Sequence, residues 1–169
     1  MASTGLDFVS GATTTQTLAV SNSYFTQNSI GIAITLSNTG GITAAIDRTG
    51  LNGNEDGLKV TAAISSAGNI KVGMTDSVAA NNTFAGVVLN NTGATGSSDV
   101  SLTHSLVEGN SVGLLGEGTG GTIWLAQSTL TGNSTSFELF SAVINTFSDN
   151  YFVANGPPSG GSLTPMNRQ

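Results

Sequence analysis

Apolar residues recur singly along the chain, separated by small polar residues, and their spacing does not follow the period of an amphipathic helix. A short block of the form Gly, apolar, any, apolar is repeated, as in GLDF (5 to 8), GIAI (31 to 34), GLKV (57 to 60), GVVL (86 to 89) and GLLG (113 to 116). Gly, Asn and Ser/Thr residues follow each block within a few positions, where they favour tight turns. The pattern predicts an all-β chain of short strands with frequent corners.

A second, longer block recurs six times, and its end copies read VSNSYFTQN (20 to 28) and FSDNYFVAN (147 to 155). The copy MTDSVAAN (74 to 81) is interpreted as one residue shorter than the others. Successive copies begin at intervals of 26, 28, 28, 23 and 22 residues, at Val20, Ile46, Met74, Leu102, Leu125 and Phe147. A period of this length, made only of strands and corners, predicts one coil of a parallel β-helix, because each coil buries its apolar residues only against the next coil.

Equivalent residues of successive coils are expected to form columns along the axis, about 4.8 Å apart. The columns predicted to point into the core are Ile32, Leu58, Val87, Leu114 and Phe137; Ile34, Val60, Leu89 and Leu139; and Phe25, Leu51, Val78, Val107, Leu130 and Phe152. The positions predicted to point outward from the Gly-apolar block are Ala33, Lys59, Val88, Leu115 and Glu138. The predicted fold is therefore a single-stranded parallel β-helix of about five to six coils with 22–28 residues per coil.

Two further columns are polar. The hydroxyl column is expected to bond to backbone groups or to adjacent coils at a corner, and consists of Ser23, Thr49, Ser77, Ser105 and Ser128, ending in Asn150. The asparagine column is interpreted as the sharp bend before the next strand, and consists of Asn28, Asn54, Asn81, Asn110, Asn133 and Asn155. Asn tolerates the left-handed backbone region and can bond within its own turn, so a turn role explains this column without a ligand.

One domain is expected, with the β-helix over residues 1–156 and a flexible C-terminal tail over residues 157–169. The tail is rich in Gly, Pro and Ser and shows no repeat. At the other end, the first coil is expected to leave the core residues Leu6, Phe8 and Leu18 uncovered. Self-association through this open N-terminal coil is therefore a hypothesis.

The charge balance restricts the partners. Ten acidic residues against four basic ones give a formal charge of −6, so the chain offers no basic surface that could neutralise nucleic acid phosphates or an anionic membrane. No apolar run approaches the ~20 residues that a membrane-spanning helix needs. Cysteine is absent, which fits either redox compartment, and residues 1 to 20 show no secretory signal.

The coils resemble right-handed parallel β-helix repeat proteins related to the pectate-lyase-like superfamily, over residues 3 to 156. They are most similar to uncharacterised bacterial members with the coil V-x-N-S-x-x-x-x-N-x-x-G-I, and VINTFSDNYFVANG (143 to 156) is similar to the closing coil of those proteins. The resemblance implies a right-handed coil, an extracellular or cell-surface location and polysaccharide as a partner. Members of this family are typically longer and exported, so the chain is expected to be an N-terminally truncated part of a longer solenoid.

Enzymatic chemistry of this superfamily would need acidic residues that converge on one face, either to hold Ca²⁺ or to act as a carboxylate pair. The acids of this chain are instead distributed over different corners of the repeat. Asp47 and the pair Glu55 and Asp56 share a coil but fall on different turns, and the pair is expected in a solvated turn. No catalytic residue, cofactor or metal site is predicted, and the single histidine makes a histidine-based metal site unfavourable.

One polar cluster is a candidate site. Arg48, Asp76 and His104 lie two residues after the first residue of three successive copies, so they are expected on three successive coils. They could orient an imidazole for acid/base chemistry. The alternative is a surface ladder with a salt bridge worth about 0–1 kcal/mol, which is favoured because no nucleophile or second acid lies beside it.

An outward Trp124 indole could stack on a sugar, but packing of this lone Trp against a loop is the favoured interpretation. No regular Thr-x-Thr array predicts an ice-binding face. The predicted function is thus a non-catalytic β-helix module with a structural or carbohydrate/partner-binding role. The alternatives are a fragment or relative of a polysaccharide lyase or hydrolase whose catalytic groups are absent from this chain, and a gene fragment without a function of its own.

Overall fold

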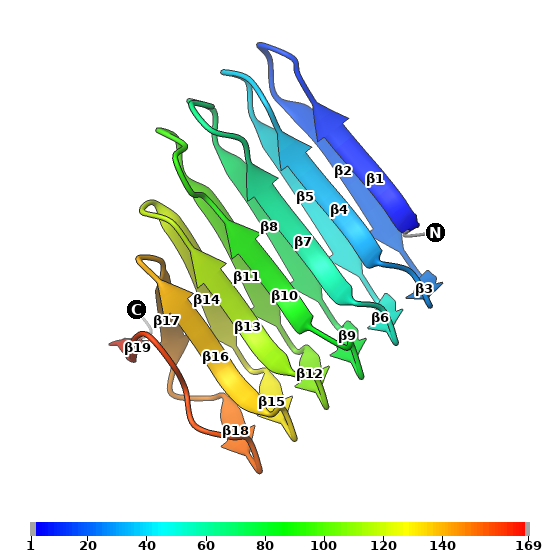
Figure 1. Ribbon diagram of the computed structural model, residues 1–169, viewed down its shortest axis with the longest axis vertical. Coiled ribbons are helices and arrows are strands. Elements are labelled where there is room, and N and C mark those ends of the chain that lie inside the picture. The colour runs from blue at the N-terminus through cyan, green and yellow to red at the C-terminus, as the bar shows by residue number, and fades with distance from the viewer. Residues whose placement is uncertain (1–2, 168–169) are drawn as a thin grey trace.

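The computed structural model describes residues 3–167, and this part of the chain forms β-strands and turns without a helix. The strands make three parallel sheets, which we call A, B and C, wound into a solenoid of about six turns (Figure 1). Hydrogen bonds between equivalent asparagines of neighbouring coils join residues that are 26, 28, 23 or 22 positions apart in the sequence. The predicted all-β parallel β-helix with 22–28 residues per coil is therefore confirmed.

Each coil contributes one strand to each sheet in turn. Sheet A contains β1 (Thr4–Ser10), β4 (Ile30–Leu36), β7 (Asp56–Ala62), β10 (Ala85–Asn90), β13 (Val112–Glu117) and β16 (Thr135–Phe140). Sheet B contains β2 (Gln16–Ser21), β5 (Ile42–Asp47), β8 (Ile70–Thr75), β11 (Ser98–Thr103), β14 (Gly121–Ala126), β17 (Val143–Phe147) and β19 (Leu163–Met166). Sheet C contains β3 (Tyr24–Thr26), β6 (Gly50–Asn52), β9 (Val78–Ala80), β12 (Leu106–Glu108), β15 (Thr129–Thr131) and β18 (Tyr151–Val153).

The predicted core columns are those of the structure, except at Phe152 and Val78 of sheet C. Phe152 aligns with Leu130 but is exposed, so the prediction of Phe152 in the core was wrong. The register of sheet A aligns Ile32, Leu58, Val87, Leu114 and Phe137, and these side chains are buried. In sheet C, however, Leu51 aligns with Ala79 and not with Val78. Ala79 is completely buried, whereas Val78 faces outward and is half-buried, so the prediction of Val78 in the core was wrong.

In the copy that begins at Met74, the prediction of Asn81 in the asparagine column was also wrong. Asn82 belongs to this column. Asn82 is buried, and its Oδ1 accepts a hydrogen bond of 2.9 Å from the backbone N–H of Asn54 in the preceding coil. Asn81 has a φ of 54° and occupies the left-handed position, which Gly53 and Gly109 hold in the neighbouring coils. The bend is therefore made by the residue before each column asparagine, and the buried column asparagines link neighbouring coils.

The hydroxyl column behaves as predicted at the corner between sheets B and C. The Ser77 hydroxyl donates to the carbonyl of Thr75 at 2.7 Å and accepts from the backbone N–H of Thr49 at 3.0 Å. Ser105 repeats this pattern with Thr103 and Ser77. The Ser77 and Ser105 hydroxyls therefore close their own turns and link them to the preceding coil.

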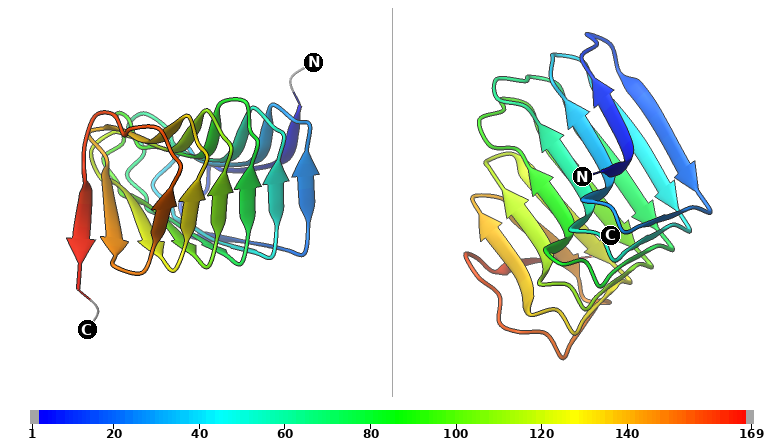
Figure 2. Two further views of the ribbon diagram at one scale, coloured as in Figure 1. Left: turned by 90° about the horizontal axis from the view of Figure 1, so that it is seen from below. Right: turned by 45° about the vertical axis from the view of Figure 1, so that its right-hand side comes forward.

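The expected flexible tail is ordered in part and continues the winding of the solenoid. Ser159 bridges to Glu138 at the edge of sheet A, and β19 pairs in parallel with β17, aligning Leu163 with Ile144. A contracted seventh coil thus covers sheets A and B at the C-terminal end. Figure 2 shows that the two ends of the described chain lie at opposite ends of the stack.

At the N-terminal end, Leu6, Phe8 and Leu18 are half-buried and pack against the core. Each is less buried than its partner in the next coil, because no coil covers it from the other side among the described residues. Across residues 3–167, no helix is long and apolar enough to cross a membrane.

Candidate functional site

The structure places Arg48, Asp76 and His104 one above another at the corner between sheets B and C. Their backbone angles φ are 46°, 48° and 49°, so all three residues occupy the left-handed region. This corner needs a residue that tolerates a positive φ, and Asp and His are among the side chains enriched there. The three residues therefore occupy equivalent positions in successive coils. The positive φ at this position accounts in part for the presence of Asp and His there.

The side chains of this column find separate partners. Arg48 forms an ion pair of 2.7 Å with Asp47 and donates through Nε to the Asn22 side chain at 3.0 Å. No hydrogen bond or ion pair within the described part of the chain joins Arg48 to Asp76 or Asp76 to His104. Asp76 and His104 are exposed and line a shallow hollow with Leu106.

The acidic residues do not gather into a metal site, since no group of three or more His, Cys, Asp or Glu residues with metal-binding geometry occurs among residues 3–167. Glu55 is exposed, but Asp56 is not in a solvated turn as expected. Asp56 begins β7, is buried and bonds through Oδ2 to Lys59 at 3.0 Å. The ion pair joins residues three positions apart in β7, so the Asp56 and Lys59 side chains lie on the same face of that strand.

Trp124 lies on the outer face of sheet B, because its neighbours Ile123 and Leu125 are completely buried and strand side chains alternate. The indole packs against the adjacent strand and not against a loop. Its Nε1–H donates to Oδ1 of Asp99 at 3.2 Å, and the side chain is half-buried. This hydrogen bond therefore fixes the indole at its Nε1 edge, on the outer face of sheet B.

Next to Trp124, the outer face of sheet B is hollowed. The column of Trp124 continues through Ser101, Gly73 and Ala45, which have small side chains or none. A Cβ atom added to Gly73 would meet nothing within 4 Å. The resulting open hollow of about 450 Å³, which we call the Trp124 hollow, also involves Lys71 and Asp99.

Sequence reasoning identified Trp124 but missed Lys71, Gly73 and Asp99. Lys71 lies three residues before the copy that begins at Met74, and Asp99 lies three residues before the copy that begins at Leu102. Gly73 lies one residue before Met74. Trp124 likewise precedes its copy by one residue. Aligning these flanking residues with the repeat would have placed all four on the outer face of sheet B.

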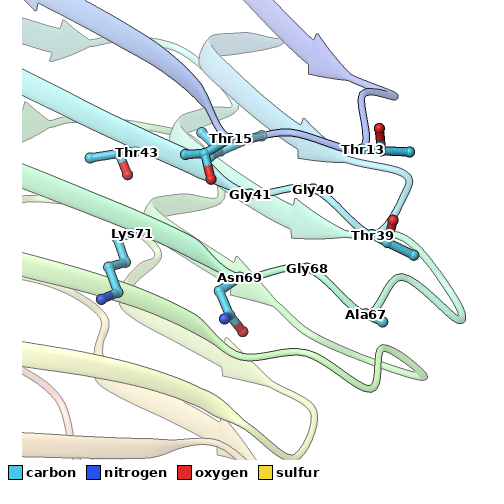
Figure 3. Close-up of a pocket in the computed structure, with 11 residues that line it drawn as sticks. Thr13, Thr15, Thr39, Gly40, Gly41, Thr43, Ala67, Gly68, Asn69 and Lys71 are labelled. Carbon is cyan, nitrogen blue, oxygen red and sulfur yellow. The ribbon is translucent and has the colours of Figure 1, made fainter.

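A second hollow of about 360 Å³ lies where sheet A turns into sheet B (Figure 3). In the close-up, Thr13, Thr39 and Ala67 lie along the turns of three successive coils, while Thr43 and Lys71 stand at the starts of strands. Glycines make up much of the floor, and we therefore call it the glycine hollow. Its polar surface consists of hydroxyls, backbone groups, the Asn69 amide and one ammonium.

Close stacking of the coils requires glycine in this floor. A Cβ atom on Gly68 would lie 1.4 Å from the carbonyl oxygen of Gly40, and one on Gly96 would lie 1.9 Å from that of Gly68. No side chain fits at these distances. Successive turns thus approach backbone to backbone, which keeps the hollow open and polar.

The two hollows share Thr43 and Lys71 and together form what we call the sheet B groove. The groove runs from the turns of the first three coils, past Lys71, to the indole of Trp124. It offers one aromatic surface, hydroxyl groups, a carboxylate and an ammonium, and no nucleophile paired with a base. Such a surface can bind a polar ligand but shows no catalytic arrangement.

No protein-family model, curated protein or solved structure was found to match this chain. The fold itself defines the class of the protein, a parallel β-solenoid. Its function must therefore be argued from the chemistry of the sheet B groove.

Proposed function

We propose that this protein is a non-catalytic β-helix module that binds carbohydrate in the sheet B groove. The observation that carries the proposal is the indole of Trp124, which Asp99 holds beside the gap at Gly73. Ligand sites combine an aromatic or apolar surface with a few fixed polar groups, and the groove has both.

The aromatic part of the groove suits a sugar ring. A pyranose has an apolar face of C–H groups that packs on an aromatic ring, and its edge carries hydroxyls that need hydrogen-bond partners. The absence of a side chain at Gly73 lets such a ring approach the backbone of β8. Trp124 is already positioned by its bond to Asp99, so little conformational entropy is lost on binding.

The polar part supplies complementary groups for vicinal hydroxyls. Asp99 uses Oδ1 for Trp124, which leaves its second carboxylate oxygen as an acceptor. Lys71 aligns with Asp99 in the sheet register, is exposed and forms no ion pair with a described residue. One sugar hydroxyl can therefore donate to Asp99 while its neighbour accepts from Lys71.

The resemblance of the coils to bacterial pectate-lyase-like β-helix proteins also supports a carbohydrate ligand. By the same resemblance, we propose that the protein acts outside the cell or on its surface. The groove contains no converging acids, which favours binding over cleavage as its role.

A glycan array followed by calorimetric titration of the hits tests the proposal. Trp124→Ala is expected to weaken binding by about 2 kcal/mol or more, as for a central aromatic contact, which is a loss of more than tenfold in affinity. A chain that binds no glycan, or that binds equally well without Trp124, would contradict the proposal.

The sharper variant fills the gap without disturbing the fold. Gly73→Val places a β-branched side chain in a strand where its Cβ meets nothing, so the variant should fold at least as stably as the parent. It should nevertheless lose glycan binding. Ala19→Val is the matched control, because Ala19 lies in the same column but outside the groove.

Catalysis by this chain would instead support the alternative of a polysaccharide lyase or hydrolase relative. A lyase forms a double bond in its product, which absorbs ultraviolet light, and a hydrolase releases reducing ends. Incubation of the array hits with the protein is expected to produce neither signal.

A further inference from the structure

Resting on the proposed carbohydrate function, we infer that the ligand of the sheet B groove is an uncharged polysaccharide, bound as an internal segment longer than a disaccharide. Two independent properties of the groove lead to this ligand class. The first is its balance of charges, and the second is the length of the groove from one hollow to the other end of the next.

The residues that line the groove carry balanced charges. Lys71 is the cation and Asp99 the anion, and the other lining residues are Thr, Gly, Ala, Ser, Ile, Val, Asn and Trp. The whole chain carries a formal charge of −6, so its long-range field repels a polyanion. A single lysine beside a carboxylate offers no row of cations that could follow the repeating charges of an acidic polymer. An uncharged polysaccharide is not repelled by the net charge of the protein and does not need a row of cations.

The span of the groove sets the minimum length of a ligand that fills it. Trp124 lies three coils beyond the coil of Gly41, which is about 14 Å along the axis. Gly41 also lies four residues before Ala45, which shares the column of Trp124, and this adds about 13 Å along the strand direction. The diagonal of about 19 Å exceeds the length of a disaccharide. A ligand that contacts both hollows is therefore an oligosaccharide or a stretch of polymer.

Lys71 and Thr43 stand where the two hollows meet, so a bound chain passes over them in its middle. Thr39 lies at the far end, in the turn (Figure 3), and its hydroxyl forms no hydrogen bond within the described residues. A ligand bound at Trp124 reaches this hydroxyl only if it extends across the junction of the two hollows. A substitution of Thr39 therefore affects the affinity for long ligands only, whereas a substitution of Trp124 affects the affinity for ligands of any length.

The test uses calorimetric titration of the full chain with cello-, xylo-, manno- and galacturono-oligosaccharides, from disaccharide to hexasaccharide. We expect at least one neutral series to bind, with an affinity that rises with length until the groove is filled. Its affinity should change by less than about twofold between low and high salt, because no charge of the ligand is screened.

Thr39→Val removes the hydroxyl while keeping the shape of the side chain. It should weaken binding of the neutral hexasaccharide about threefold to tenfold, as expected for one hydrogen bond, and leave the disaccharide unaffected. Thr92→Val is the matched control, since Thr92 is an exposed turn residue outside the groove.

Three outcomes would overturn the inference. Tighter, salt-sensitive binding of the galacturonides would show an acidic ligand, and equal affinity for disaccharide and hexasaccharide would show a site confined to one hollow. In both cases the proposed function would stand, because glycan still binds. Absence of binding to any series, with the Trp124→Ala variant indistinguishable from the parent, would remove the inference and the proposed function together.

Discussion

Asn82 illustrates how single residues hold neighbouring coils together. Its side-chain amide donates to the carbonyl of Leu51 at 3.0 Å and to Oδ1 of Asn110 at 2.9 Å, while its Oδ1 accepts from the backbone of Asn54 at 2.9 Å. All of these groups are buried, where an unpaired polar group costs about 1–3 kcal/mol. The asparagine column therefore satisfies backbone groups that water cannot reach at the corner.

Replacing Asn82 with Ala should lower the free energy of unfolding by about 2–4 kcal/mol, because the Leu51 carbonyl and the Asn54 N–H lose their buried partner. Asn81→Gly is the control and should change it by less than about 0.5 kcal/mol, since the ease of glycine at a positive φ offsets its larger unfolded-state entropy. Denaturant unfolding measures both values. The reverse ranking would contradict the assignment of Asn82 to the column.

The corner column of Arg48, Asp76 and His104 gives a second expectation at this scale. His104→Asn retains a residue that tolerates the φ of 49° and removes the imidazole. The unfolding free energy should change by less than about 0.5 kcal/mol, as for an exposed surface position, and glycan affinity should stay the same. Loss of any measured activity in this variant would instead support an acid/base role for the cluster.

At the scale of the elements, the turns between sheets A and B are defined by how closely their backbones approach. Gly68 faces the Gly40 carbonyl, whereas Gly73 faces open space on the next strand. The two glycines therefore have opposite roles, since the first permits stacking of turns and the second leaves room for a ligand.

This contrast predicts opposite effects of the same substitution. Gly68→Ala should destabilise the fold by about 4 kcal/mol or more, because the turn must separate from its neighbour to accept a methyl group. Gly73→Ala should be neutral or stabilising by up to about 1 kcal/mol, since it reduces unfolded-state entropy without a clash. Thermal and denaturant unfolding distinguish them, and similar stabilities would contradict the stacked geometry of the turns.

The C-terminal segment is paired with the last full coil, as a flexible tail would not be. Ile144 is completely buried and pairs with Leu163 of β19. Truncation after Gly156 should therefore expose the end of the core and lower the melting temperature, with increased aggregation through the uncovered edge of β17. A truncated chain as stable and monomeric as the parent would show that β19 contributes nothing to the fold.

Much of the architecture could be predicted from the sequence because the repeat fixes the register. Equivalent apolar residues recur at nearly constant intervals, and a strand shifted by one residue would turn its core residues outward. The exception at Val78 arose from the consecutive residues Asn81 and Asn82, since spacing alone does not show which of them takes the left-handed position. The neighbouring coils contain Gly-Asn there, which points to the second asparagine.

The tail and the groove were harder to predict for different physical reasons. The seventh coil is contracted, so its residues fall outside the period that revealed the others. The groove depends on what surrounds Trp124 in three dimensions, and Lys71, Gly73 and Asp99 come from coils that are distant in sequence. The register places them together, but only the coordinates show that Gly73 leaves a hollow and that Asp99 fixes the indole.

For the whole molecule, the solenoid separates stability from function. The core and the polar columns at the corners repeat in every coil, so the stacking energy is distributed along the axis. The outer face of sheet B is not needed for that stacking and varies from coil to coil, from Thr43 to Lys71 to Asp99. A groove for a polymeric ligand can therefore run along the axis without weakening the fold.

The most direct test uses Trp124, which is the single tryptophan of the chain and therefore gives one indole N–H signal in a ¹H–¹⁵N correlation spectrum. Titration with the neutral hexasaccharides should shift this signal to saturation in the parent and in Ala19→Val, but not in Gly73→Val. An indole signal that stays in place with every glycan, in a chain whose other signals show it to be folded, would contradict carbohydrate binding in the sheet B groove.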